Sequence, residues 1–558
     1  MHFDLVLDNA EVFTVDRATP RAGSIGIIGD RIVAVAERGG LSGYDTAHVV
    51  DLEGRFVVPG FNDAHNHMPA FGATLNEVPL HAGAVHSVEE IVDAIGARTA
   101  ITPAGAWIVG AGYDHNKLAE RRHPTCHELD RVSPDHPVLL NHTSGHFATL
   151  NTAAMRLARI GEADVPPGGV VALGEDGRPN GLLEEQAQQL VRTLLHPRSV
   201  ADMVANLGAA SDRYLREGVT SCQEAGVGGI LGTAEPLELA AYQRARRDGR
   251  LRVRVTLMAS VDALHDVDHH ADDPEPFTLD LGLHTGFGDD WLRFGPTKIF
   301  ADGSLMGRTA AMFDDYDGEP GNNGYFQMPE ERLHRLILAA HRSGWQIATH
   351  AIGDRAVSSV LDAYEAALAR HPRADHRHRI EHCGMCRSSD VDRIARLGVI
   401  PVPQARFISE IGDGMLAAVG PDRRRDCYRE RSFLDAGITL PGSSDRPVVN
   451  GAPLLGIHDL VNQRTASGAS FNPHEALTVE EAITTYTMGS ATAAFDERRK
   501  GSITPGKLAD LVVLDRDLTS IDPDGIAETG VLATMVGGRF EFAADDLGAG
   551  IHTDDVRA

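Results

Sequence analysis

The side chains with the clearest chemical potential are two histidines that follow an apolar run near the start of the chain. The segment Val57–His67 begins as an apolar strand pattern and ends in His65-Asn66-His67. Because residues i and i+2 of a strand point to the same face, we expect His65 and His67 to project together. Two imidazoles on one face at the carboxyl end of a strand supply half of a zinc site.

Length and composition indicate a multidomain globular protein. The chain has 558 residues, of which 42% are hydrophobic, so two or three domains are expected. No apolar run approaches the ~18 residues needed to cross a bilayer, and the segment Met1–Leu7 alternates like a strand rather than a signal peptide. The net charge is −27 without a long Lys/Arg cluster, so we expect neither nucleic-acid nor membrane binding. Five cysteines, an odd number, indicate reduced thiols and a cytoplasmic protein.

Strand and helix patterns predict a central barrel and a β-domain built from both ends of the chain. Residues 1–56 and 491–545 both contain short strands with tight turns, so we expect one composite β-sandwich domain. Between them, eight strand patterns alternate with helical ones, which predicts a (β/α)8 TIM barrel, an α/β fold, rather than a doubly wound sheet. The predicted barrel strands are Phe56–Phe61, Val219–Gln223, Arg252–Met258, Arg293–Phe300, Gln346–His350, Arg379–Cys383, Val399–Gln404 and Thr439–Ser443, and the clearest helices are Pro329–Arg342, Arg355–Arg370 and Ser388–Leu397.

The long gap between the first two barrel strands indicates an insertion. We expect residues 57–71 to supply the first barrel strand with its metal motif and residues 72–200 to form an inserted subdomain over the barrel mouth. Residues 201–490 would complete the barrel, and residues 546–558 would be a tail. Acidic loops are expected at His265–Asp290 and Asp314–Asn323, after the third and fourth strands, where they would influence specificity.

Further metal-compatible side chains stand at the ends of other predicted barrel strands. Active sites of such barrels form at the carboxyl ends of several strands. Four imidazoles and a carboxylate suit Zn²⁺ or a similar divalent ion, and we expect one or two ions per chain. The six candidate metal ligands are His65, His67, Lys298, His350, His382 and Asp445.

Lys298 needs its own argument, because a protonated lysine repels a cation. A buried lysine loses its proton readily, and a neutral amine takes up CO₂ to give a carbamate with two oxygens that can bridge two metals. The alternative for Lys298 is a buried lysine that makes a salt bridge.

With these residues in place, the chain resembles the amidohydrolase superfamily of metal-dependent hydrolases. The resemblance rests on the ligand pattern along the barrel and on the turn Gly501–Val513, which is typical of the composite β-domain of that superfamily. The chain further resembles the amidohydrolase-3 branch, which includes N-substituted formamide deformylases. The segments that carry this closer resemblance are Lys298–Ser304, His350–Val357, Arg379–His382, Gly442–Pro447 and Gly145-His146 with Asn151. These segments indicate the fold and the metal site more specifically than they indicate the substrate.

The resemblance implies a hydrolase that cleaves a C–N bond through metal-activated hydroxide. The expected substrate is a small linear amide, such as an N-substituted formamide or an N-acyl compound. Asp445 would take a proton from the attacking water and pass it to the leaving nitrogen. His146, in the insertion, would bind the substrate carbonyl or recognise substrate, and a purely structural role for it stays open. We also expect a homodimer.

Two other functions stay open. One is a cyclic-amide hydrolase or deaminase on the same fold, and the other is a non-catalytic regulatory or binding protein on a degenerate barrel. The intact ligand set disfavours the second. Glu224 stands where an aspartate is expected after the second strand, so no metal role is assigned to it. Glu381 is expected to hold structure rather than act as the base, and Cys383 and Cys386 are expected to be reduced thiols.

Overall fold

The computed structural model describes residues 2–81, 83–142, 147–162, 164–166, 169–192, 194–195, 199–229, 237–268 and 275–544. They form two units: unit 1 comprises Met1–Met68 and Ala210–Ala558, and unit 2 comprises Pro69–Ala209. Helix α1 (Met68–Asn76) leads the chain from unit 1 into unit 2, and α6 (Val200–Arg216) leads it back. Among the described residues, no helix combines the length and apolarity needed to span a membrane.

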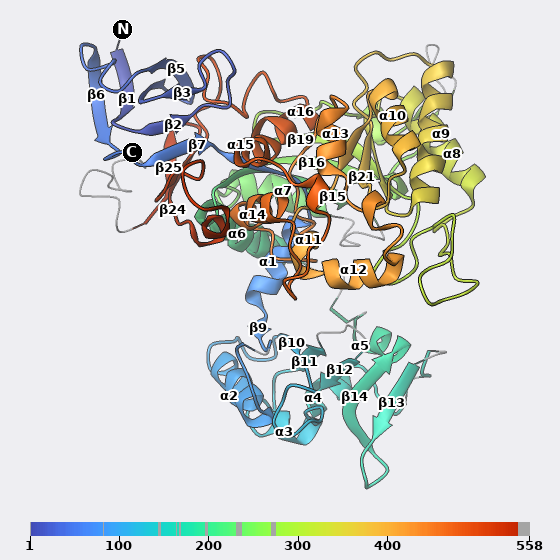
Figure 1. Ribbon diagram of the computed structural model, residues 1–558. Coiled ribbons are helices and arrows are strands. Elements are labelled where there is room, and N and C mark those ends of the chain that lie inside the picture. Colours follow the sequence, from blue (N-terminus) through green and yellow to red (C-terminus); the bar gives the residue numbers. More distant parts are fainter. Residues whose placement is uncertain are drawn as a thin grey trace. The chain divides into compact units, whose positions relative to one another are not determined.

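The β-domain of unit 1 is built from both ends of the chain, as predicted. Strand β7 (Phe56–Pro59) pairs with β2 (Glu11–Phe13) on one side and β23 (Leu511–Leu514) on the other, so blue and red strands share one sheet in Figure 1. A hydrophobic cluster with members from both sheets of this domain holds them together. The remaining strands are β1 (His2–Asp8), β3 (Arg21–Ala22), β4 (Ser24–Ile28), β5 (Arg31–Ala36), β6 (Asp45–Asp51), β24 (Val531–Val536) and β25 (Arg539–Ala543).

The predicted TIM-like barrel is confirmed by a seven-stranded parallel sheet in unit 1. Its strands follow one another in chain order and are buried along almost their whole length, as expected for a sheet covered by helices. The predicted eighth strand, Thr439–Ser443, is not a strand in the structure. The segment still runs beside β8, where the Gly442 carbonyl accepts a hydrogen bond from the Ala64 N–H at 3.0 Å. The strands are β8 (Phe61–Asn66), β15 (Val219–Val227), β16 (Arg254–Ser260), β19 (Leu292–Phe300), β20 (Ile347–Ala351), β21 (Arg379–His382) and β22 (Ile400–Val402).

Helices connect the barrel strands. The three clearest sequence predictions correspond to α8 (Glu330–Arg342), α9 (Asp354–Arg370) and α10 (Ser388–Leu397). Helix α10 ends where Gly398 adopts a left-handed conformation (φ 71°), which glycine reaches without steric cost. Other helices of unit 1 are α7 (Glu238–Arg247), α11 (Phe407–Glu410), α12 (Gly412–Val419), α13 (Glu430–Asp435), α14 (Pro453–Asn462), α15 (Val479–Thr484) and α16 (Ser490–Ala493), and a short ribbon consists of β17 (His265–Asp266) and β18 (Phe277–Thr278).

The prediction of a single strand over Phe56–Phe61 is wrong. Gly60 divides the segment into β7, which belongs to the β-domain, and β8, which opens the barrel. A Cβ atom on Gly60 would lie 2.2 Å from Oγ1 of Thr220, so only glycine fits at the point where the chain leaves one sheet and enters the other. As a consequence, His65 lies within the first barrel strand rather than after it.

Unit 2 contains a six-stranded mixed sheet covered on both faces. Successive residues of β11 (Val138–His142) face opposite sides, so Val138 and Leu140 join one hydrophobic cluster and Leu139 joins another. Strands β9, β10 and β11 run parallel, and β12 then pairs antiparallel with β11. The other elements are β9 (Val78–Pro79), β10 (Ile108–Tyr113), β12 (Phe147–Leu150), β13 (Gly169–Leu173), β14 (Pro179–Glu185), α2 (Val88–Thr99), α3 (Cys126–Asp130), α4 (Thr152–Leu157) and α5 (Gln189–Arg192).

Candidate metal centre

Strand β8 and the segment beside it bring His65, His67 and Asp445 together. Oδ1 of Asp445 lies 3.5 Å from Nε2 of His65 and 3.2 Å from Nε2 of His67. Ligand atoms about 2.1 Å from a tetrahedral Zn²⁺ are about 3.4 Å from one another. Both distances are close to that value, and one ligand atom from each of the three residues lies within 4.8 Å of the others. Two imidazoles with a carboxylate are also a suitable donor set for a divalent ion.

Lys298 reaches the same cluster from β19. Its Nζ lies 3.4 Å from Nε2 of His65 and 5.0 Å from the centre of the Phe300 ring. Burial lowers the pKa of Lys298 to about 8, even though the nearby carboxylates of Glu381 and Asp445 oppose the shift. A larger fraction of this lysine is therefore an uncharged amine near neutral pH than is usual for the residue.

His350 and His382 complete the group from β20 and β21. The two imidazole rings are 4.5 Å apart between centres, and the His382 ring is 5.0 Å from the His65 ring. In the parallel ladder His382 pairs with Ala351, the residue after His350, so both histidines stand at the same end of the sheet. The structure thus brings together all six ligands predicted from the sequence.

Neighbouring oxygen atoms fix which nitrogen of these histidines carries a proton. Nδ1 of His65 donates to Glu381, and Nδ1 of His382 donates to Oε1 of Gln404 at 2.6 Å. Nε2 of His350 donates to the Gly303 carbonyl at 2.9 Å. In each ring the other nitrogen keeps its lone pair, which is the form that binds a metal.

Contacts within the cluster shift the pKa of two of its members, Asp445 and His67. Burial would raise the pKa of Asp445, but contacts with His65 and His67 outweigh burial and hold that pKa well below its usual range. Burial also opposes protonation of His67, yet Asp445 and Glu224 together raise the pKa of His67 to about 9. Asp445 is therefore a carboxylate at neutral pH, which is the form that binds a metal.

Three carboxylates that support the site were not assigned to it from the sequence. Oε2 of Glu224 accepts hydrogen bonds from the Met68 N–H and the Tyr242 hydroxyl, and its Oε1 lies 3.8 Å from Nδ1 of His67. Asp63 accepts from the backbone N–H groups of His65 and Ser444, at 3.1 and 3.0 Å, so it joins β8 to the segment that carries Asp445.

The third such carboxylate is Asp302. It accepts hydrogen bonds from the N–H groups of Ile352 and Gly353, at 3.0 and 2.8 Å, and its Oδ1 lies 3.5 Å from Nε2 of His350. Glu224 follows the predicted strand Val219–Gln223 and Asp302 follows β19, so the strand-end argument could also have found these two. Asp63 is the third residue of the six-residue strand β8 and gives no such signal.

Two of the clustered residues have strained backbone conformations. His382 and Asp445 have φ angles of 70° and 59°, a region that residues with a Cβ atom seldom occupy. Each such residue costs on the order of 1–3 kcal/mol and persists where surrounding contacts fix it. For Asp445 one such contact is its N–H, which donates to the His65 carbonyl at 2.7 Å.

Other residues singled out in the sequence lie elsewhere. His146 is outside the described residues, so its predicted role stays a prediction. Cys383 and Cys386 are buried free thiols, as are the other three cysteines. Glu381 is buried between Arg379 and His65, in the supporting position expected from the sequence.

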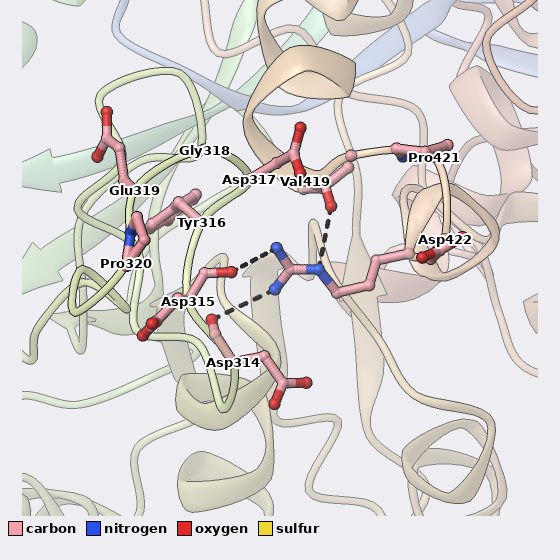
Figure 2. Close-up of a pocket in the computed structure, with 12 residues that line it drawn as sticks. Asp314, Asp315, Tyr316, Asp317, Gly318, Glu319, Pro320, Val419, Pro421 and Asp422 are labelled. Atoms are coloured by element: carbon pink, nitrogen blue, oxygen red, sulfur yellow. Dashed lines mark hydrogen bonds between the residues drawn. The ribbon is translucent and has the colours of Figure 1, made fainter.

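A surface pocket of about 440 Å³ is lined by part of the predicted acidic loop after the fourth barrel strand (Figure 2). The Arg423 guanidinium donates to the carbonyl oxygens of Asp314 and Asp315 at 3.3 and 2.7 Å, and its Nε donates to the Val419 carbonyl at 3.0 Å. Arg423 therefore joins the acidic loop to the end of α12. The pocket lining contains none of the six clustered residues.

Comparisons with known proteins identify relatives of this chain and a solved structure with the same fold. The chain is 31% identical to the N-substituted formamide deformylase of Arthrobacter pascens over 97% of its own length and 98% of that protein. It is 31% identical to the protein LONG AFTER FAR-RED 3 of Arabidopsis thaliana, over 96% of its length and 91% of that protein. The crystal structure of an uncharacterized metal-dependent hydrolase from Pyrococcus furiosus superposes with a TM-score of 0.74 at 28% identity, covering 92% of this chain and 100% of that one.

The family assignment follows from a match that extends over most of the chain. Residues 48–542 match the family described as the amidohydrolase family. That range includes the barrel, the insertion and the C-terminal strands of the composite β-domain, but not β1–β5. The protein therefore belongs to the amidohydrolase family of metal-dependent hydrolases.

Proposed function

We propose that the protein hydrolyses a C–N bond in a linear amide, with N-substituted formamides as the first substrate class. The observation that carries the proposal is the position of Asp445, whose Oδ1 lies within 3.5 Å of both histidines of the His-x-His motif. The choice of amide is supported by the formamide deformylase, which aligns over 97% of this chain.

The proposed metal ligands are His65, His67, Lys298, His350, His382 and Asp445, and the proposed ion is Zn²⁺, one or two per chain. A bound divalent ion would supply a water that reacts near neutral pH and would polarise the substrate carbonyl. The borderline-soft imidazole donors favour Zn²⁺ over Mg²⁺ or Ca²⁺, which prefer oxygen ligands.

Asp445 would move the proton during the reaction. Its low pKa keeps it as a carboxylate at neutral pH, so it can accept a proton from the attacking water. The same carboxyl group can then donate that proton to the leaving nitrogen, which is necessary because an amide anion is a very poor leaving group.

We further propose that Lys298 is carboxylated. The uncharged amine attacks the carbon of CO₂ and loses one proton, which yields a carbamate with one negative charge. The lowered pKa of Lys298 and its burial beside His65 support this step, because both raise the share of reactive amine. The homodimer and the cytoplasmic location expected from the sequence stay predictions.

The proposal is tested by metal analysis together with a substrate panel. Zinc-loaded protein is incubated with N-substituted formamides, N-acyl amino acids, cyclic amides and aminopurines, and formate, amine and ammonia are quantified. We expect amine and formate from the formamides, loss of both in Asp445→Asn, and no loss in the matched surface variant Asp422→Asn. Turnover of ring substrates alone would support the cyclic-amide hydrolase or deaminase instead, and no turnover by fully loaded protein would support a binding role.

A further inference from the structure

Unit 2 holds a second cluster of metal-compatible side chains, formed by Asp114, His115 and His142. In the parallel ladder of β10 and β11, Tyr113 pairs with His142. Asp114 and His115 follow Tyr113 directly, so all three side chains stand at the carboxyl end of two adjacent strands. The sheet changes from parallel to antiparallel pairing next to this point, between β11 and β12. In α/β sheets, ligands bind outside the carboxyl ends of parallel strands, which is where these three side chains stand.

The spacing of the cluster is suited to an ion. Nδ1 of His115 lies 3.0 Å from Nε2 of His142, which in turn lies 3.9 Å from Oδ1 of Asp114. One potential ligand atom from each residue lies within 4.8 Å of the others. These separations bracket the distance of about 3.4 Å between two ligands of a tetrahedral Zn²⁺. Two imidazoles with one carboxylate also match the His65, His67 and Asp445 group in composition.

Neighbouring groups hold the three side chains in place. The His123 ring stacks on the His115 ring, with centres 4.0 Å apart and planes at 25°. The Tyr113 hydroxyl lies 2.9 Å from Nδ1 of His123, which fixes that ring in turn. Oδ1 of Asp114 accepts the Asn116 N–H at 3.0 Å, and the exposed Lys117 ammonium lies 3.8 Å from its Oδ2. Such surrounding contacts are what orients ligands in metal sites.

We propose that Asp114, His115 and His142 bind a divalent metal ion, Zn²⁺ or a similar ion, within unit 2. Three protein ligands leave one position for water or for an anionic or carbonyl ligand. Because the ligands come from the ends of β10 and β11, the ion would join two neighbouring strands and stabilise unit 2. The alternative for the same geometry is a hydrogen bond between two neutral imidazoles, one as donor and one as acceptor.

The experiment removes the barrel site first, so that its metal is not counted. Full-length His65→Ala/His67→Ala protein is stripped with a chelator, titrated with Co²⁺ and Zn²⁺, and examined by elemental analysis, visible absorption and thermal unfolding. We expect one remaining equivalent of metal, a cobalt spectrum with nitrogen ligation, and a rise in the unfolding temperature on Zn²⁺ addition. Adding His142→Ala, or the half-exposed His115→Gln, should weaken Co²⁺ binding at least tenfold, whereas the exposed control His127→Ala should not.

Two outcomes would overturn the proposal. A folded His65→Ala/His67→Ala protein that binds no Co²⁺ or Zn²⁺ would leave the cluster as a hydrogen-bonded imidazole pair. Undiminished Co²⁺ affinity in a folded His115→Gln variant would place any remaining ion at other residues. Circular dichroism verifies folding in each case. The amide-hydrolase proposal is not involved, because this background lacks the barrel histidines on which that activity depends.

Discussion

Nδ1 of His65 donates a hydrogen bond to Oε2 of Glu381, and both side chains are fully buried. Burial would raise the pKa of Glu381, but the Arg379 charge and the hydrogen bond from His65 outweigh burial and hold that pKa far below its usual range. Glu381 therefore stays a carboxylate, and it keeps the proton of His65 on Nδ1. The other nitrogen, 3.5 Å from Asp445, keeps its lone pair for a metal.

Replacement of Glu381 tests this positioning role. Glu381→Gln keeps the shape of the side chain but removes the charge that fixes His65 and pairs with Arg379. We expect metal affinity to fall about 10–100-fold, the usual effect of losing such a partner. Chelator competition measures the change, and the exposed Glu365→Gln is the control. Equal affinities in wild type and Glu381→Gln would mean that His65 does not depend on Glu381.

Removal of both histidines of the His-x-His motif tests the metal site directly. His65→Ala/His67→Ala deletes two imidazoles that both face Asp445. We expect the barrel metal and the hydrolase activity to be lost, while circular dichroism shows a folded protein. Elemental analysis and the amide assay measure the two effects. Full activity in this double variant would contradict the assignment.

That the six candidate ligands lie together could be predicted from the sequence, because their positions follow strand periodicity. Each predicted ligand stands at or near the end of an apolar strand, and parallel strands in a barrel bring such ends together whatever the loop lengths between them. The helix Ser388–Leu397 was predicted to the residue because Gly398 marks its end. The division at Gly60 was missed, since a glycine within an apolar run gives no sign that the chain changes sheets there.

The supporting contacts could not be predicted in the same way. Glu224 contacts His67, Met68 and Tyr242 through tertiary packing, and a single sequence does not reveal which residues lie across a barrel. The left-handed conformation of Asp445 was equally hidden, because aspartate adopts it more often than most residues but only at a minority of positions. Individual hydrogen bonds and backbone angles of this kind can therefore be identified only from the structure.

Substitution of Lys298 tests the carbamate. Lys298→Ala removes the group 3.4 Å from Nε2 of His65, so we expect metal content to fall and activity with it. If the ligand is a carbamate, added acetate or propionate should restore part of both, because a small carboxylate can occupy the space left by the side chain. Lys298→Met is the comparison that fills that space. A crystal of fully loaded, active enzyme with an unmodified Lys298 would rule the carbamate out.

The capping residue Glu128 gives a prediction about stability and pH in unit 2. Its carboxylate accepts hydrogen bonds from Arg122 and from the N–H of Thr125 at the start of α3. Arg122 is the main cause that lowers the pKa of Glu128 to about 2, against the opposing effect of burial. Because the native pKa is below the ordinary value, the stabilisation is complete above about pH 4.5 and is lost as pH falls toward about 2.

Glu128→Gln should therefore reduce the opening free energy of α3 by about 1–2 kcal/mol at neutral pH. The difference from wild type should shrink steadily below about pH 4.5. Hydrogen exchange of the α3 amides at several pH values measures both effects. Glu89→Gln, which removes a surface carboxylate bonded to Arg131, should change little at any of these pH values. A pH-independent loss in Glu128→Gln would mean that shape rather than charge matters there.

Asp445→Asn is the most direct test of the proposed chemistry. Asparagine keeps the size of the side chain but cannot accept a proton, so kcat should fall at least ~10²-fold, in line with the usual contribution of general acid–base catalysis. Metal content should fall less than in His65→Ala/His67→Ala, because one ligand is weakened rather than two removed. Because the pKa of Asp445 lies well below its usual range, the acidic limb that it causes should lie at low pH and should be absent from the variant. Turnover near that of wild type with an unchanged pH profile would exclude Asp445 as the proton carrier and direct the next substitutions to Glu381 and His146.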